Sequence, residues 1–114
     1  MRRWNGWGDD AIEAHLPDGA LDFLRERIGA AQRPVAATKE QALADIGGSR
    51  LPAHPLVDTS AEARLTASFG QSLGDWLRLR FGRIDVVVDG VAAPNDLADI
   101  RVLLDWAQQV GARV

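Results

Sequence analysis

The two histidines are the only side chains in this sequence that could carry imidazole chemistry. His15 follows three nearby carboxylates, Asp9, Asp10 and Glu13, and this mixture of residue types occurs in metal sites. No pair of ligands repeats at a spacing such as His-x-x-x-His, which places two side chains on one helix face, so we predict no metal site. His54 stands in a proline-rich irregular segment, where a histidine bonded to the backbone is the expected state.

The other residue types give little support for nucleophilic or acid–base catalysis. The sequence has no cysteine and no tyrosine, which excludes disulfides, thiolate ligands and a phenolic acid among these residues. Ser72 follows Gln71 and would need a neighbouring base to act as a nucleophile, whereas a helix-capping role explains it fully. The carboxylates have no spacing typical of an acid–base pair. We therefore predict no catalytic, cofactor-binding or metal-binding residue in this chain.

Arginine supplies nearly all of the positive charge, and four arginines are candidates for a phosphate clamp on a substrate or cofactor: Arg64, Arg78, Arg80 and Arg83. Arginines two positions apart on a helix point to different faces. The interpretation that we favour is therefore solvated arginines, or ion pairs with Asp75 and Asp85.

Two tryptophans, Trp4 and Trp7, lie in the glycine-rich run RWNGWG at residues 3–8. One interpretation is that they line a substrate or lipid channel. The other, which we favour, is an aromatic anchor that packs this segment against the rest of the protein.

Residues 1–83 contain several sequence signals that predict the beginnings and ends of helices. Asp18 is expected to cap a helix over Ala20–Ile28, and Gly29 to end it. The capping-box spacing then occurs three times, at Thr38 with Gln41, Thr59 with Glu62, and Ser72 with Asp75. The helices that these boxes open are expected to run through Ile46, Phe69 and Phe81. The prolines of residues 49–57 keep that segment extended.

The sequence changes character after residue 83. Ile84–Val88 is rich in β-branched residues and is predicted to be a strand. Asn95 is expected to cap an amphipathic helix over Asp96–Val110, which Gly111 ends. Ala112–Val114 has the composition of a further strand. Strand, helix and strand in this order predict the beginning of a parallel β-α-β unit.

The expected fold class is therefore α+β, with a helical region at residues 1–83 and an incomplete strand–helix unit at residues 84–114. The apolar stripe of the last helix has little sheet to cover. We expect it to stay exposed and to lead to homo-oligomers or aggregation.

Charge and composition exclude some classes of partner. The net charge of −3 argues against nucleic acid, and no apolar run is long enough to span a membrane. No apolar stretch follows the first arginines, so a secretory signal is not expected. The absence of cysteine fits a reducing compartment, and we expect the protein in the cytoplasm.

Four segments carry a family resemblance: RWNGWGDD, SRLPAHPLVDTS, ARLTASFGQSLGDWLRLRFGRI and DGVAAPNDLADIRVLLDWAQQVGARV. Their order resembles the N-terminal region of bacterial FAD-linked oxidases of the vanillyl-alcohol-oxidase or p-cresol-methylhydroxylase superfamily, which are similar to alkyldihydroxyacetonephosphate synthase. Val88 and Ala93 depart from the pattern, since this family usually has a proline and often a tyrosine at these positions.

The resemblance implies that residues 84–114 begin a PCMH-type FAD-binding domain, whose glycine-rich pyrophosphate loop is expected beyond Val114. It implies FAD-dependent oxidation of a hydroxy acid or alcohol, or the redox-neutral ether-lipid synthase reaction, with the flavin supplying the chemistry. The implied partners are the remainder of the flavoenzyme chain and its small-molecule substrate. This chain alone is then structural rather than catalytic. A stand-alone protein-interaction module and a gene remnant are the alternatives.

Overall fold

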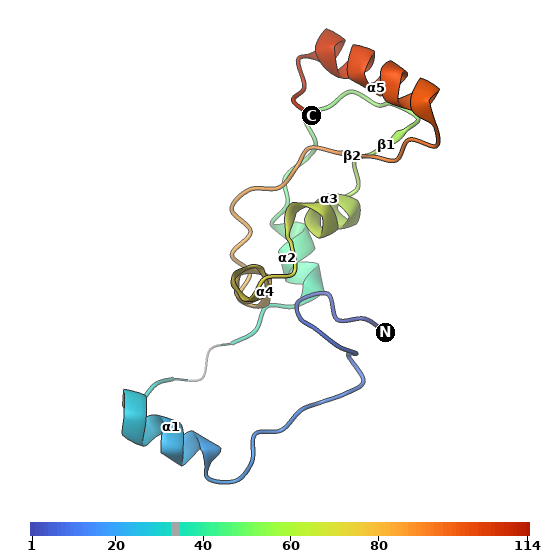
Figure 1. Ribbon diagram of the computed structural model, residues 1–114. Helices are drawn as coiled ribbons and strands as arrows, with labels where there is room; N and C mark the ends of the chain where they lie inside the picture. The colour runs from blue at the N-terminus through green and yellow to red at the C-terminus, as the bar shows by residue number, and fades with distance from the viewer. Residues whose placement is uncertain (33–34) are drawn as a thin grey trace.

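The computed structural model describes residues 1–32 and 35–114, and within them the chain forms helices and one small sheet (Figure 1). The elements, in chain order, are α1 (Ala20–Ile28), α2 (Lys39–Ala44), β1 (Val57–Asp58), α3 (Ala61–Ser68), α4 (Leu73–Arg80), β2 (Val91–Ala92) and α5 (Leu97–Val110). Helices combined with an antiparallel strand pair confirm the α+β class.

Two of the predicted capping boxes are present. The Thr38 side chain accepts a hydrogen bond from the Gln41 amide, and Gln41 returns one to the Thr38 amide. Ser72 and Asp75 make the same exchange at the start of α4. These boxes satisfy amides that the first turn of a helix leaves without intrahelical partners. Helix α2 ends at Ala44, earlier than predicted.

The third predicted box, at Thr59 with Glu62, was wrong by one position. Ser60 is the cap of α3, because its backbone is extended and its hydroxyl accepts from the Ala63 amide. The Asp58 carboxylate accepts from the Ser60 amide at 2.8 Å, which fixes the chain in this register.

The predicted caps of the first and last helices were also one residue early. Gly19, with φ of 82°, precedes α1 and makes no side-chain cap, so Asp18 does not have this role. Asp96 caps α5 by accepting from the Asp99 amide at 2.8 Å. Asn95 instead donates its backbone and side-chain N–H groups to the Asp99 carboxylate. The expected stop of α5 at Gly111 is confirmed, in the left-handed conformation.

The predicted strand at Ile84–Val88 was wrong, because this segment is in no strand. Helix α3 takes the place of a neighbouring strand. The Val88 amide donates to the Ser68 hydroxyl at 2.9 Å, and the Val88 carbonyl accepts from the Arg64 guanidinium at 2.8 Å. Side chains of a helix therefore satisfy backbone groups that a β ladder would otherwise pair.

The strand pairing is antiparallel, so the predicted parallel β-α-β unit was wrong. Val57 pairs with Ala92 and Asp58 with Val91, which joins the proline-rich segment to the chain before α5. Residues 112–114 form no strand in the described part of the chain. Val88 and β2 contact residues before position 83, so contacts join the two regions that the sequence analysis separates between residues 83 and 84. The division of the chain into these two regions stays a prediction.

The core is small and lies where α2, α3 and α4 meet. It consists of Ala42, Leu65, Trp76 and Leu79, with partly buried apolar neighbours around it. On α5, Leu103 and Ala107 are also buried. By contrast, α1 buries no residue and lies at one end of the molecule, away from the other helices (Figure 1).

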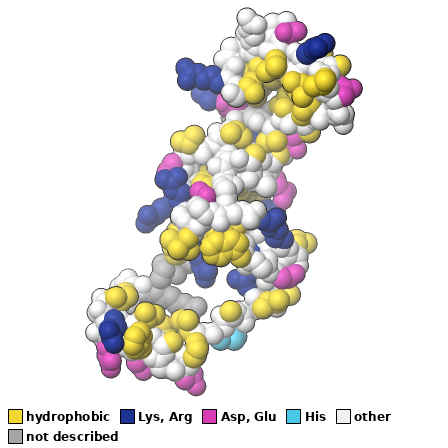
Figure 2. Space-filling view, viewed as in Figure 1, with side chains coloured by type: hydrophobic (Ala, Val, Ile, Leu, Met, Phe, Trp, Pro, Cys, Tyr) yellow, Lys and Arg dark blue, Asp and Glu magenta, His cyan; other side chains and the backbone are white. Residues whose placement is uncertain are grey.

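The molecule is long and exposes an unusual amount of surface. Its extents are 58 × 24 × 23 Å and its radius of gyration is 19.1 Å, whereas a compact chain of this length has about 13 Å. Its accessible surface is 8995 Å², and a compact monomer of this mass exposes about 6,100 Å². Apolar side chains gather on the exposed surface over α1 (Figure 2).

Candidate functional site

The histidines do not form a reactive site. Among the described residues no group of three potential ligands lies close enough to hold a metal ion, and the exposed His15 lies 4.0 Å from Glu13 alone. The His54 Nδ1 accepts from the Leu56 amide at 3.2 Å, which confirms the predicted backbone bond. Its ring packs 4.8 Å from the Trp106 ring, so His54 connects the segment before β1 to α5.

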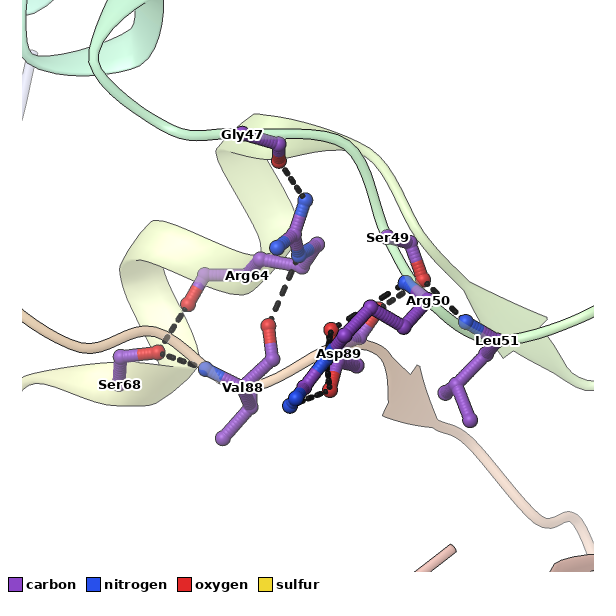
Figure 3. Close-up of polar contacts among 8 residues, drawn as sticks. All are labelled: Gly47, Ser49, Arg50, Leu51, Arg64, Ser68, Val88 and Asp89. Atoms are coloured by element: carbon purple, nitrogen blue, oxygen red, sulfur yellow. Dashed lines mark hydrogen bonds and ion pairs between the residues drawn. The ribbon is translucent and has the colours of Figure 1, made fainter.

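Arg64 is structural rather than part of a phosphate clamp. Its side chain is 4% exposed, and two of its nitrogens donate to the Val88 carbonyl at 2.8 Å and the Gly47 carbonyl at 2.7 Å (Figure 3). The Ser68 hydroxyl donates to the Arg64 carbonyl at 2.6 Å and accepts from Val88. We call these four residues the Arg64 clasp. It holds two distant loops against α3.

An ion pair continues the clasp along the same loops. The Arg50 guanidinium donates to both carboxylate oxygens of Asp89, and the Ser49 hydroxyl donates to the Asp89 carbonyl at 2.6 Å (Figure 3). The hydrogen bond from Arg50 lowers the pKa of Asp89, and the nearby positive charge of Arg64 adds to this effect. Asp89 is therefore held as a carboxylate to tie the loops together.

The three remaining candidate arginines, Arg78, Arg80 and Arg83, are all exposed. None of them makes an ion pair in the described part of the chain, so the predicted pairs with Asp75 and Asp85 were wrong. Asp75 is occupied as a cap, accepting from the Ser72 hydroxyl at 2.7 Å. The three arginines form no clamp, and solvation explains them.

The tryptophan segment is anchored to the core, as predicted. Trp4 packs against the buried cluster, and the ring of Trp7 meets that of Trp76 edge to face at 6.1 Å. The segment folds back on itself, because Arg2 and Asp9 form an antiparallel bridge. The Arg3 guanidinium supports this fold by donating to the Asp9 carbonyl at 3.1 Å.

Beside this segment lies an open hollow of about 260 Å³, which we call the Trp4 cavity. Its lining comes from the N-terminal segment, α2, α3 and α4, and consists of Arg2, Arg3, Trp4, Lys39, Glu62, Leu65, Thr66, Phe69, Gly70, Gln71, Trp76 and Leu79. Sequence reasoning missed this site, because the lining residues lie far apart along the chain.

A second hollow, of about 280 Å³, lies between the strand pair and α5. Its walls are mainly apolar and include Leu51, Val57, Ile100, Leu104 and Trp106. We call it the α5 groove. Of the apolar stripe that the sequence predicted to stay exposed, Leu103 and Ala107 are buried, whereas Ile100 and Leu104 are exposed.

No helix in the part of the chain that the structure describes is long and apolar enough to cross a membrane.

Comparison with known proteins gives one structural likeness. No protein-family model and no curated protein matches the sequence. A solved structure of alkyldihydroxyacetonephosphate synthase superposes with a TM-score of 0.58 at 18% sequence identity, over 96% of this chain and 26% of that one. The chain therefore spans about a quarter of the length of that protein and shares the fold of that part of it.

Proposed function

We propose that this chain is the N-terminal part of a cytoplasmic FAD-dependent oxidoreductase that acts on a hydroxy acid or alcohol, in the manner of FAD-linked oxidases and alkyldihydroxyacetonephosphate synthase. Within that enzyme its function is architectural: it supports the PCMH-type flavin domain and carries no catalytic residue. The observation that carries the proposal is the fold match, which covers nearly all of this chain but only 26% of the synthase.

The exposed surface supports an architectural role. The chain exposes 8995 Å², about 2,900 Å² more than a compact monomer of its mass. Large permanent interfaces bury surfaces of this order. The apolar side chains of α1 and the α5 groove lie on that surface, so a partner surface that covers them would remove apolar area from water.

The glycine pair Gly47-Gly48 does not fit the pyrophosphate of FAD. Such a site needs backbone amides that converge on the phosphates. The glycine pair Gly47-Gly48 follows a short helix rather than a strand, and the Gly47 carbonyl accepts from Arg64. We therefore propose that the pyrophosphate-binding loop lies beyond Val114.

The test is a comparison of two polypeptides in an FAD titration followed by flavin fluorescence. The first is the 114-residue chain, and the second is the product of the same reading frame read past codon 114. The proposal predicts that the short chain leaves flavin fluorescence unchanged and that the extended product quenches it at stoichiometric FAD. A stop at codon 115, or an extended product that binds no flavin, would contradict it.

The exposed apolar face of α1 also favours a second candidate, a stand-alone module that binds another protein. The same titration separates the two candidates, since the module predicts no flavin binding by either polypeptide. It also predicts that the 114-residue chain is monodisperse and unfolds cooperatively in sedimentation and urea experiments.

A further inference from the structure

Asn5 and Gly6 form the one Asn-Gly dipeptide of the sequence, and they lie in the middle of the tryptophan segment. Residues 4–8 bend without belonging to a helix or a strand, and both residues of the dipeptide are partly exposed. In the part of the chain that the structure describes, neither the Gly6 amide nor the Asn5 carboxamide makes a hydrogen bond. Both groups are therefore available to react with each other, and water reaches them.

The reaction that this pair supports is spontaneous deamidation. The Gly6 backbone nitrogen attacks Asn5 Cγ, so that a bond forms between these two atoms. The bond from Cγ to Nδ2 breaks, and Nδ2 leaves as ammonia with the proton that the Gly6 nitrogen gives up. Glycine favours the attack because no Cβ crowds the attacking backbone. Water then opens the resulting succinimide ring, and no oxidant or cofactor is needed.

Water opens the ring in two ways. Breaking the new bond from Cγ to the Gly6 nitrogen gives an ordinary aspartate. Breaking the original bond from the Asn5 carbonyl carbon to the Gly6 nitrogen gives isoaspartate, in which the backbone runs through Cβ and Cγ and is one carbon longer. Either product adds one negative charge to a net charge of −3.

The other asparagine of the sequence, Asn95, is protected from this reaction. Its backbone and side-chain N–H groups donate to the Asp99 carboxylate at 2.9 and 3.0 Å. The residue that follows it, Asp96, has a Cβ and is fixed as the cap of α5. The two asparagines therefore form a matched pair within one chain, with one held and one available.

A longer backbone at position 5 would disturb the anchor of this segment. The loop is closed, because the Arg3 amide donates to the Gly8 carbonyl at 3.1 Å. Trp4 packs on the core on one side of the dipeptide, and on the other side the Trp7 ring meets Trp76 at 6.1 Å. An extra backbone atom between the two indoles changes their separation and direction, so both contacts cannot persist.

We propose that Asn5 is a site of spontaneous deamidation and that isoaspartate at this position releases the Trp7 ring from Trp76. The modification acts as an irreversible change in how the N-terminal segment is anchored. This proposal does not depend on the flavin proposal, because every group that it uses lies in this chain.

The first experiment is peptide mass mapping of the 114-residue chain during incubation at pH 8 and 37 °C. The tryptic peptides 4–25 and 84–101 each contain a single side-chain amide, that of Asn5 and that of Asn95. The first peptide should gain the mass of an amide converted to an acid, whereas the second should stay unchanged.

A variant of the neighbouring glycine tests the chemistry. A Cβ at Gly6 would have Arg3 Cδ as its nearest contact, at 3.8 Å, and Gly6 has no positive φ, so Gly6→Ala should keep the fold. The added Cβ crowds the attacking nitrogen, and deamidation of Asn5 should become about tenfold slower or more.

A second variant separates the extra backbone atom from the extra charge. Anion exchange isolates the modified chain, and an endoprotease that cleaves before aspartate but not before isoaspartate identifies the isoaspartyl form. Asn5→Asp carries the same charge on a normal backbone. The isoaspartyl form should lose near-ultraviolet circular dichroism from its tryptophans and unfold at a lower urea concentration, whereas Asn5→Asp should match the wild type in both measurements.

The proposal is overturned if peptide 4–25 keeps its mass while the chain is folded, or if Asn95 deamidates as fast as Asn5. It is also overturned if Gly6→Ala deamidates at the wild-type rate. An isoaspartyl form with the same near-ultraviolet spectrum as Asn5→Asp would overturn the claim that the modification releases Trp7.

Discussion

Replacing Arg64 with methionine tests the Arg64 clasp most directly. Methionine keeps the apolar length of the side chain but removes the donors to the Gly47 and Val88 carbonyls. A hydrogen bond from a charged group contributes about 1.5–3 kcal/mol. Water can reach the partly buried carbonyls and compensate some of the loss, so we expect the free energy of unfolding to fall by about 3 kcal/mol.

The assay is urea unfolding followed by far-ultraviolet circular dichroism. With a slope of about 1–3 kcal/mol per molar urea, Arg64→Met should lower the unfolding midpoint by at least about 1 M. Arg101→Met removes an arginine from an exposed position on α5 and serves as the control. Hydrogen exchange of the Val88 amide should accelerate in Arg64→Met alone, because the loop that Ser68 bonds then detaches from α3. Equal midpoints for both variants would refute the structural role of Arg64.

Three further predictions follow from the same structure. Gly90→Ala should destabilise the chain by about 1–3 kcal/mol in urea unfolding, because its Cβ would lie 2.7 Å from Val57 Cγ1. Gly48→Ala should leave the stability unchanged, because its Cβ would meet no atom within 4 Å. Arg50 lowers the folded-state pKa of Asp89, so the contribution of Asp89 to stability is present at neutral pH and should be lost as pH falls below about 4. Asp89→Asn should remove this part of the pH dependence of the free energy of unfolding. If the variant lost stability in acid just as the wild type does, the result would argue against the ion pair. Amides of α1 should exchange within seconds in the isolated chain, because a short helix without buried residues is unstable in water, and strong protection there would contradict the need for a partner surface.

The sequence was sufficient for features that depend on near neighbours. The boxes of Thr38 and Ser72 were predicted correctly because both bonds of a capping box lie within four residues. The same rule failed at Thr59, where Ser60 offers an equivalent hydroxyl one residue later and Asp58 selects that register. The last helix and its glycine stop were clear because fourteen residues repeat one apolar pattern.

Features that depend on distant residues could not be predicted. The β-branched run at Ile84–Val88 has the composition of a strand, but its partner is helix α3 and not another strand. The pairing of β1 with β2 joins segments that no periodicity connects. The Trp4 cavity likewise depends on four separate segments. The aromatic anchor of Trp4 and Trp7 was predictable, whereas the space beneath it was not.

The central claim is that this chain is the architectural N-terminal part of a flavoenzyme. The most direct measurement is the mass and absorbance of the native protein, captured from its source cells with an antibody against residues 39–114. The account predicts a polypeptide several times longer than 114 residues, with FAD absorbance near 450 nm at about one flavin per chain. A native polypeptide of 12.4 kDa without flavin would contradict it.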